Sequence, residues 1–308
     1  MNGIINIYKE KGYTSFDVVA KLRGILHEKK IGHTGTLDPQ ATGVLPVCVG
    51  HATKVCGLLT DKDKEYETVL QLGLATDTQD ATGQILRDGR DDLHTLTEDR
   101  VREVIMSFVG DYEQIPPMYS ALKVGGRKLC DLAREGIEVE RKARLVHIYE
   151  IQIMQIQLPL ITMRVHCSKG TYIRTLCDDI GVRLGVGGLM KQLVRTRVSS
   201  FALEQALTLE QVEAHRDAGT LNEILMPVDA VFEQYPALHV KKEAHKKLQN
   251  GNRLTIADVS FDGILVHVTP ESGQRFRVYD EAGMFYGIYG WDAQRGDLKS
   301  IKMFYNEN

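Results

Sequence analysis

The sequence predicts an α+β protein with a mixed or antiparallel sheet, an inserted arm and a small C-terminal β-barrel. Residues 64–73 and 144–167 alternate between apolar and polar side chains, which is typical of strands with one wet face. After Tyr235-Pro236, short apolar runs are separated by glycines, as in small barrels. A chain of 308 residues exceeds one typical domain. We therefore expect a large domain over residues 1–235 and a small one over residues 236–308.

The first elements lead to a glycine-rich loop. Residues 3–8 predict a short strand, and Ser15 is the expected cap of a helix with apolar residues at helical spacing between Val18 and Ile25. Residues 29–39 hold two glycines, small polar residues and a proline, so they predict a loop. The apolar, β-branched run at 43–50 predicts a buried strand.

The inserted arm is expected near residues 115–145. The two prolines of Gln114–Tyr119 break regular structure, and the charged, glycine-bearing segment after them includes one amphipathic piece at Leu129–Ala133. The other expected elements are a helix at 97–109, an antiparallel strand pair at 144–160 and 161–167, a helix at 171–184, a helical stretch from Thr208 towards Tyr235, and a short helix at 241–248.

The charge distribution favours a nucleic-acid partner although the net charge is −3. Residues 120–200 carry 14 Lys and Arg against 7 Asp and Glu, so this part of the chain is basic. Phosphates respond to local positive potential rather than to total charge. On charge alone, a solvated charged face is an equally good interpretation.

The cysteines and the apolar runs indicate in which cellular compartment the protein is expected. The five cysteines are odd in number and scattered, which indicates reduced thiols rather than a disulfide framework. No apolar run approaches the roughly 18–20 residues of a membrane span, and the N-terminus lacks the pattern of a signal peptide. We expect a cytoplasmic protein without membrane contact.

One acidic residue in the glycine-rich loop is a candidate for catalysis. The glycines around Asp38 allow close approach of a ligand, and Pro39 holds Asp38 in extended geometry. The alternative is that Asp38 is an ordinary turn residue before proline. Metal sites are not expected, because the His and Cys residues lack paired spacing and Asp77–Gly83 lacks the ligand series of a calcium loop.

The loop and four further blocks resemble the bacterial tRNA pseudouridine synthase B family. GHTGTLDPQATGVLPVCVGHATK, at residues 32–54, is similar to the catalytic motif of that family. The blocks at Lys64–Tyr66, Gln114–Lys123, Ser168–Leu176 and Leu193–Arg197 match in the same order, and the tail resembles a PUA-type RNA-binding domain. The resemblance spans nearly the whole chain.

The resemblance implies conversion of uridine to pseudouridine at position 55 of the tRNA T-loop, with the target base flipped out of its stack. Asp38 would be catalytic and Arg174 would pair with it, although an arginine on a helix surface is the alternative. Tyr66 would stack on the base, which also makes it a supporting residue. The other implied substrate contacts are His33, filling the space the base leaves, Lys64, Tyr172 and Leu193.

The resemblance also implies contacts with the RNA backbone. In the predicted arm and in the Leu193–Arg197 block these are Lys123, Arg127, Lys128, Arg134 and Arg195, with Arg141, Lys142 and Arg144 beside them. The tail would contact the acceptor end of the tRNA through Lys241, Lys242, Lys246 and Lys247, while the other cations would bind the T-arm. We expect a monomer that needs no protein partner.

Two positions depart from the family pattern. Cys130 stands where the family often has an aromatic residue, which puts one contact of the arm in doubt. Val194 stands where a second arginine is frequent, so one phosphate contact is in doubt as well.

The implied reaction breaks the bond between ribose C1′ and uracil N1 and joins C1′ to C5 without redox change or net hydrolysis, so no cofactor is expected. Two rival classes stay open: a non-catalytic protein that binds or folds RNA, and a glycosidase-like RNA enzyme. A glycosidase usually needs two carboxylates, and no second loop of comparable character carries one.

Overall fold

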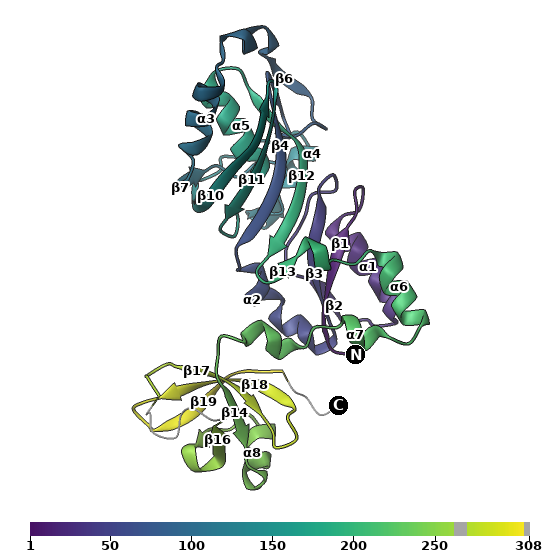
Figure 1. Ribbon diagram of the computed structural model, residues 1–308, viewed down its shortest axis with the longest axis vertical. Coiled ribbons are helices and arrows are strands. Elements are labelled where there is room, and N and C mark those ends of the chain that lie inside the picture. The colour runs from purple at the N-terminus through teal and green to yellow at the C-terminus, as the bar shows by residue number, and fades with distance from the viewer. Residues whose placement is uncertain (262–269, 305–308) are drawn as a thin grey trace.

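The structure is a computed structural model that describes residues 1–261 and 270–304. It forms an elongated molecule with a large lobe and a smaller one below it (Figure 1). Within the described residues, the large lobe is built on a nine-stranded sheet in the order β1-β3-β12-β4-β11-β10-β7, with β2 and β13 paired beside it. The strands are β1 (Gly3–Lys9), β2 (Ile31–His33), β3 (Thr42–Val49), β4 (Lys64–Leu72), β7 (Gly110–Gln114), β10 (Arg144–Gln157), β11 (Leu160–Cys167), β12 (Gly188–Val198) and β13 (Phe201–Ala202).

The large sheet is mixed, which is one of the two arrangements, mixed or antiparallel, expected from the sequence. β12 pairs antiparallel with β4 but parallel with β3, where Arg195 lies opposite Gly43. β4 occupies the centre, and Tyr66 lies between Arg195 of β12 and Val165 of β11. β4 and β11 alternate in burial because one face of this sheet is covered and the other is wet.

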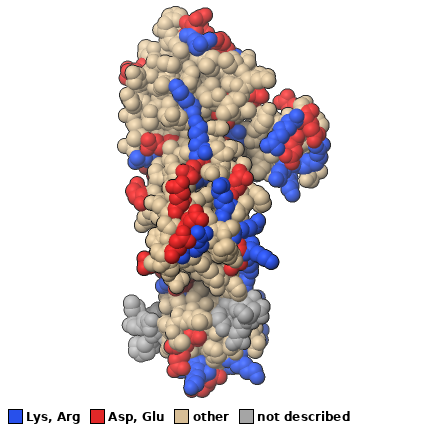
Figure 2. All heavy atoms as spheres, turned by 90° about the vertical axis from the view of Figure 1, so that its right-hand side faces the viewer, with Lys and Arg blue, Asp and Glu red and all other residues tan. Residues whose placement is uncertain are grey.

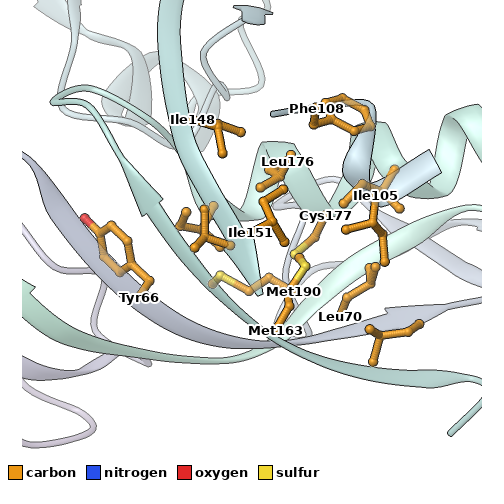
Figure 3. Packing of buried hydrophobic residues seen from close by; sticks show 14 of the residues in the cluster. Tyr66, Leu70, Ile105, Phe108, Ile148, Ile151, Met163, Leu176, Cys177 and Met190 are labelled. Carbon is orange, nitrogen blue, oxygen red and sulfur yellow. The ribbon is translucent and has the colours of Figure 1, made fainter. Parts of the chain in front are cut away.

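Helices cover the sheet in two groups. α3 (Glu98–Met106) and α5 (Ile173–Leu184) pack over β4, β10 and β12, and the core between helices and sheet includes Leu176 and Cys177 of α5 and Met163 of β11 (Figure 3). A second group covers β1 and β3 with α1 (Ser15–Leu26) and α6 (Leu209–Asp217). Further elements of this lobe are α2 (Cys56–Thr60), α7 (Leu221–Ile224), and the hairpin of β5 (Leu74–Thr76) and β6 (Ile85–Asp88).

The arm expected near residues 115–145 is present between β7 and β10. It consists of a hairpin, β8 (Lys123–Val124) and β9 (Arg127–Lys128), followed by α4 (Leu129–Arg134). Figure 2 shows the arm projecting from the large lobe, with basic and acidic side chains intermingled on it. Leu129 and Leu132 are the buried residues of α4, in agreement with the amphipathic piece predicted there.

In the part of the small lobe that the structure describes, six strands form a sheet in the order β15-β19-β18-β17-β14-β16, an almost closed barrel. It contains β14 (Ala237–Val240), α8 (His245–Gln249), β15 (Leu254–Thr255), β16 (Val259–Phe261), β17 (Arg275–Tyr279), β18 (Phe285–Asp292) and β19 (Asp297–Met303). Ile288 and Phe304 pack into an apolar cluster with Val44 and Phe232, so the two lobes share buried surface. The exact division at residues 235 and 236 stays a prediction.

Three local expectations need correction. Thr14, not Ser15, is the N-cap of α1, because its hydroxyl accepts from the amide of Asp17, and the Asp17 carboxylate accepts from Thr14 in return. The predicted loop at 29–39 contains the short strand β2, which is held by pairing with β3. The helical stretch after Thr208 is α6, α7 and a 3-10 turn at Val228–Phe232 rather than one helix.

Two glycines inside helices give a matched test of packing. A Cβ at Gly181 of α5 would lie 2.0 Å from the backbone nitrogen of Gly188 in β12, whereas a Cβ at Gly24 of α1 would meet no atom within 4 Å. Gly181→Ala should lower the free energy of unfolding by about 1–3 kcal/mol or more. Gly24→Ala should raise it by about 0.5–1 kcal/mol, since alanine is the better helix former. Urea unfolding of both variants checks this, and equal effects would contradict it.

Candidate functional site

The loop that carries Asp38 is fixed on both sides. Both the amide and the hydroxyl of Thr34 donate to the carbonyl of Pro46, each at 3.1 Å. The hydroxyl of Ser15 accepts from the amide of Leu37 at 2.9 Å, so the start of α1 supports the loop. Beyond Asp38, its own carbonyl accepts from the amide of Ala41 at 3.0 Å. The Asp38 side chain is therefore presented by a rigid turn, with 34% of its surface exposed.

Arg174 pairs with Asp38, as the resemblance implies. Its Nη2 lies 3.2 Å from Oδ1 of Asp38 and donates to the carbonyl of Tyr119 at 2.7 Å. The guanidinium is 6% exposed, so it is not the surface arginine of the alternative interpretation. Burial raises the pKa of the Asp38 carboxyl above its usual range, and the neighbouring Arg174 opposes this rise.

The start of α5 is fixed by a residue that sequence reasoning left in a breaker segment. The side-chain amide of Gln114 donates to the carbonyl of Tyr172 at 2.9 Å and accepts from the amide of Tyr172 at 2.8 Å. This two-way bond joins the end of β7 to the first turn of α5. It thereby sets the position from which Arg174 reaches Asp38.

Sequence reasoning also missed Lys9, the last residue of β1. Its side chain is fully buried, and its Nζ donates to the carbonyls of Tyr13, Glu10 and Pro39 at 2.6, 3.1 and 3.3 Å. Burial lowers the pKa of Lys9 to about 8, against the opposing effect of Asp38. A lysine at the end of an apolar strand was the available signal, but a strand end is usually wet. Lys9 anchors the residue that follows Asp38.

Tyr66 and Leu193 lie in the same apolar cluster as Leu37 of the loop. Tyr66 is 8% exposed and stands at one side of this cluster, with its hydroxyl directed away from the labelled apolar side chains (Figure 3). Burial raises the pKa of Tyr66 to about 12, so the phenol is neutral at ordinary pH. Leu193 of β12 is 9% exposed.

Arg195 does not lie where a phosphate of the RNA could reach it. The expectation that Arg195 contacts the RNA backbone is therefore wrong. The side chain is 1% exposed. Its Nε donates to the carbonyl of Val44 at 2.7 Å and its Nη1 to that of Thr36 at 3.4 Å. Because the guanidinium lies beneath the loop and beside Tyr66, Arg195 supports the loop from below. Sequence alone does not separate a buried arginine in a strand from an exposed one.

Lys64 is buried as well. Its Nζ donates to the carbonyls of Thr60 and Lys62 at 2.7 and 2.6 Å, and burial lowers its pKa to about 8. These bonds hold the ammonium group at the end of α2. Contact between Lys64 and a substrate stays a prediction, and it would require both bonds to break.

His33 and Tyr172 flank the site from different elements. His33 ends β2, and its Nδ1 accepts from the amide of Gly35 at 3.3 Å. Burial lowers the pKa of His33, which favours the neutral ring. Tyr172 precedes α5, and burial raises its pKa. Their contacts with a substrate stay predictions.

The predicted cationic residues of the arm are on its surface. Lys123, Arg127, Lys128 and Arg134 are exposed, but Arg127 is paired with Glu135, and Arg134 lies 3.4 Å from Asp131. Within residues 1–261 and 270–304, no three His, Cys, Asp or Glu side chains gather as a possible metal site. In the same residues, no helix is both long and apolar enough to cross a membrane.

Comparisons with known proteins point to one family. The model of the TruB family pseudouridylate synthase N-terminal domain matches residues 23–173, and that of the tRNA pseudouridylate synthase B C-terminal domain matches residues 174–233. The tRNA pseudouridine synthase B of Lachnoclostridium phytofermentans is 53% identical over 99% of this chain and 100% of its own. That of Clostridium kluyveri is 44% identical over 99% of this chain and 100% of its own.

A solved structure shares the fold. In a crystal structure of a Cbf5-Nop10-Gar1 complex, the matching chain is 27% identical, with a TM-score of 0.71, over 98% of this chain and 85% of that one. The α+β fold with an inserted arm and a C-terminal barrel is thereby confirmed. From its family-model matches and its near full-length relatives, the chain belongs to the TruB family of pseudouridylate synthases.

Proposed function

We propose that the protein isomerises uridine to pseudouridine in tRNA, at position 55 of the T-loop, with Asp38 as the catalytic residue. The observation that carries the proposal is the Asp38–Arg174 pair, which presents one carboxylate at a fixed turn beside Tyr66 and Leu193. The near full-length relatives named tRNA pseudouridine synthase B support the reaction and the RNA class.

The reaction needs one ionised carboxylate. The bond between C1′ and N1 breaks, the base turns, C1′ bonds to C5, the proton leaves C5, and N1 takes up a proton. Asp38 serves as the nucleophile or base that starts this exchange. Burial raises the pKa of Asp38, and Arg174 opposes this rise and holds the orientation of the carboxylate.

The base-binding surfaces follow from the same geometry. A neutral Tyr66 ring offers an aromatic face for stacking without repelling Asp38, and Leu193 offers an apolar surface. The target base must leave its stack to reach them, which costs a few kcal/mol. A neutral His33 on the adjoining strand is the residue we assign to the vacated space.

The arm and the small lobe are assigned to the RNA backbone. Lys123 and Lys128 on the arm would contact phosphates of the T-arm, and the lysines of α8 would contact the acceptor end. We further propose that the protein acts as a monomer in the cytoplasm without a protein partner. The scattered cysteines favour that compartment.

Asp38→Asn should abolish isomerisation while leaving RNA binding intact. Unmodified tRNA tritiated at C5 of uridine should release tritium with the wild type, and at least about 10³-fold more slowly with the variant. The exposed Asp99→Asn on α3 is the matched control and should match the wild type. Tight tRNA binding by a wild type that releases no tritium would support the RNA-binding alternative, and release of free uracil would support a hydrolase.

Arg174→Gln should change the pH dependence of the reaction. Because Arg174 lowers a carboxyl pKa that burial raises, its loss should raise the pKa of Asp38 further. The acid limb of kcat/KM should then move to higher pH, with a rate loss of roughly 10²-fold from misplacement of the carboxylate. Arg174→Lys keeps the positive charge, so the acid limb of its kcat/KM profile should stay near the wild-type position. A pH–rate profile that is unchanged in Arg174→Gln would contradict this role.

Binding of tRNA should weaken as salt is raised. Lys123→Ala and Lys128→Ala should each reduce the slope of log affinity against log salt by about one, since each removes one phosphate contact. Arg102→Ala on the exposed face of α3, away from the site, is the matched loss of one charge and should leave the slope unchanged. Fluorescence anisotropy across a salt series measures this slope. A wild-type tRNA affinity that does not vary with salt would exclude the assignment of these lysines to phosphate contacts.

A further inference from the structure

Two of the five cysteines come together in the fold. Cys48 of β3 lies directly opposite Gly32 of β2. A Cβ at Gly32 would lie 3.2 Å from Sγ of Cys56, the first residue of α2. Side chains of directly opposed residues in an antiparallel pair share one face and stand about 4.5–5.5 Å apart. The Cys56 thiol therefore occupies the space that Gly32 leaves free, beside the thiol of Cys48.

The two thiols interact as donor and acceptor. Both lie in the apolar cluster at the joint of the lobes, where Cys48 is fully buried and Cys56 is partly exposed. The hydrogen bond from Cys48 lowers the pKa of Cys56 against the effect of burial, and Lys302 of β19 lowers it further. The same hydrogen bond, together with burial, raises the pKa of Cys48 far above its usual range. Cys56 is thus the thiol that ionises and meets solvent, with Cys48 behind it.

The other three cysteines lack this combination. Cys167 and Cys177 are buried, which raises the pKa of each to about 12. Cys130 is partly exposed on α4, but its Sγ lies beside a carboxylate oxygen of Asp131 at 3.7 Å. Redox-sensitive cysteines are typically partly exposed, stand in electropositive surroundings and have a second thiol nearby. Cys56 with Cys48 meets all three conditions.

We propose that Cys48 and Cys56 form a peroxide-sensitive pair, in which oxidation to a disulfide slows isomerisation and reduction restores it. In a reducing compartment, disulfides of this kind are transient and serve redox sensing rather than stability. The effect on the rate rests on the proposed function, whereas formation of the bond does not.

The oxidant is a hydroperoxide, with hydrogen peroxide as the simplest member. The Cys56 thiolate attacks one peroxide oxygen, the O–O bond breaks, and hydroxide leaves and takes up a proton as water. Cys56 is then a sulfenic acid. The sulfur of Cys48 attacks that of Cys56, the S–O bond breaks, and the departing hydroxide takes the Cys48 proton as a second water. Two thiols are oxidised by two electrons, and the peroxide is reduced to two waters.

The new bond would move the segment that begins α2. An S–S bond is about 2.05 Å long, shorter than any contact between two thiols. Cys48 is held by β1 on one side and β2 on the other, so Cys56 has to move. The carbonyl of Cys56 accepts from the hydroxyl of Thr60, whose own carbonyl accepts from Lys64. The Cys56 thiol also lies against the residue before His33. Oxidation would therefore displace Lys64 and His33, and displacements of about 1 Å can cost up to 10²-fold in rate.

The first measurement is a map of the cysteines after exposure of the full chain to hydrogen peroxide. Lys54 lies between the two thiols, so trypsin releases Cys48 in residues 31–54 and Cys56 in residues 55–62. Once free thiols are blocked, peroxide-treated wild type should yield these two peptides joined, and dithiothreitol should separate them. Cys56→Ser should keep Cys48 as a free thiol. Cys48→Ala should stop at the sulfenic acid, which dimedone traps on Cys56.

The second measurement is tritium release from tRNA before and after oxidation. The wild type should slow on the order of tenfold in peroxide and recover with dithiothreitol. Cys56→Ser keeps a side chain of similar size and should hold its rate in peroxide. Cys130→Ser removes the other partly exposed thiol and is the matched control, so it should slow as the wild type does.

The outcomes separate this proposal from the proposed function. Five free thiols after peroxide treatment, or a disulfide between other cysteines, would overturn the thiol pair. A bond between Cys48 and Cys56 that leaves the rate of tritium release unchanged would overturn its effect on isomerisation. The peptide map needs no substrate, so it decides the pair independently, while tritium release by the reduced wild type tests the proposed function.

Discussion

The ion pair between Asp38 and Arg174 is the interaction on which the site depends. Burial raises the pKa of the Asp38 carboxyl because it penalises the charged form, and the neighbouring Arg174 opposes this rise. The partners are separated by 136 residues and come from a loop and a helix. The ion pair can therefore form only when the strands between the two residues have assembled in the correct order.

The parallel contact between β3 and β12 provides that order. At Gly43 the backbone has φ +105°, and a Cβ there would lie 2.2 Å from the carbonyl oxygen of Arg195. Only glycine permits so close an approach. The Arg195 side chain then bonds back to Val44 and Thr36, so one residue joins the strand that follows the Asp38 loop to the loop itself. Arg195 thus contributes to the architecture of the site rather than to its outer surface.

Buried cations surround the loop, and each is held by main-chain carbonyls. Lys9 donates to the carbonyl of Tyr13 in the turn after β1, Lys64 to that of Thr60 at the end of α2, and Arg195 to that of Val44 in β3. Such bonds offset the cost of burying the charges. The positive charge beneath the loop also opposes protonation of Asp38, since Lys9 lowers the Asp38 pKa as Arg174 does.

The sequence by itself determined the fold class, the order of most elements and the residues of the pair. Alternation with period two predicted β4, β10 and β11, and the long motif around Asp38 identified the loop, since both are local properties of the chain. Only the tertiary structure decided the burial of Lys9, Lys64 and Arg195 and the two-way bond of Gln114 to Tyr172. The local sequence does not distinguish a lysine or arginine that faces water from one that is buried against a main-chain carbonyl. That choice is made by contacts between distant segments, which no local pattern encodes.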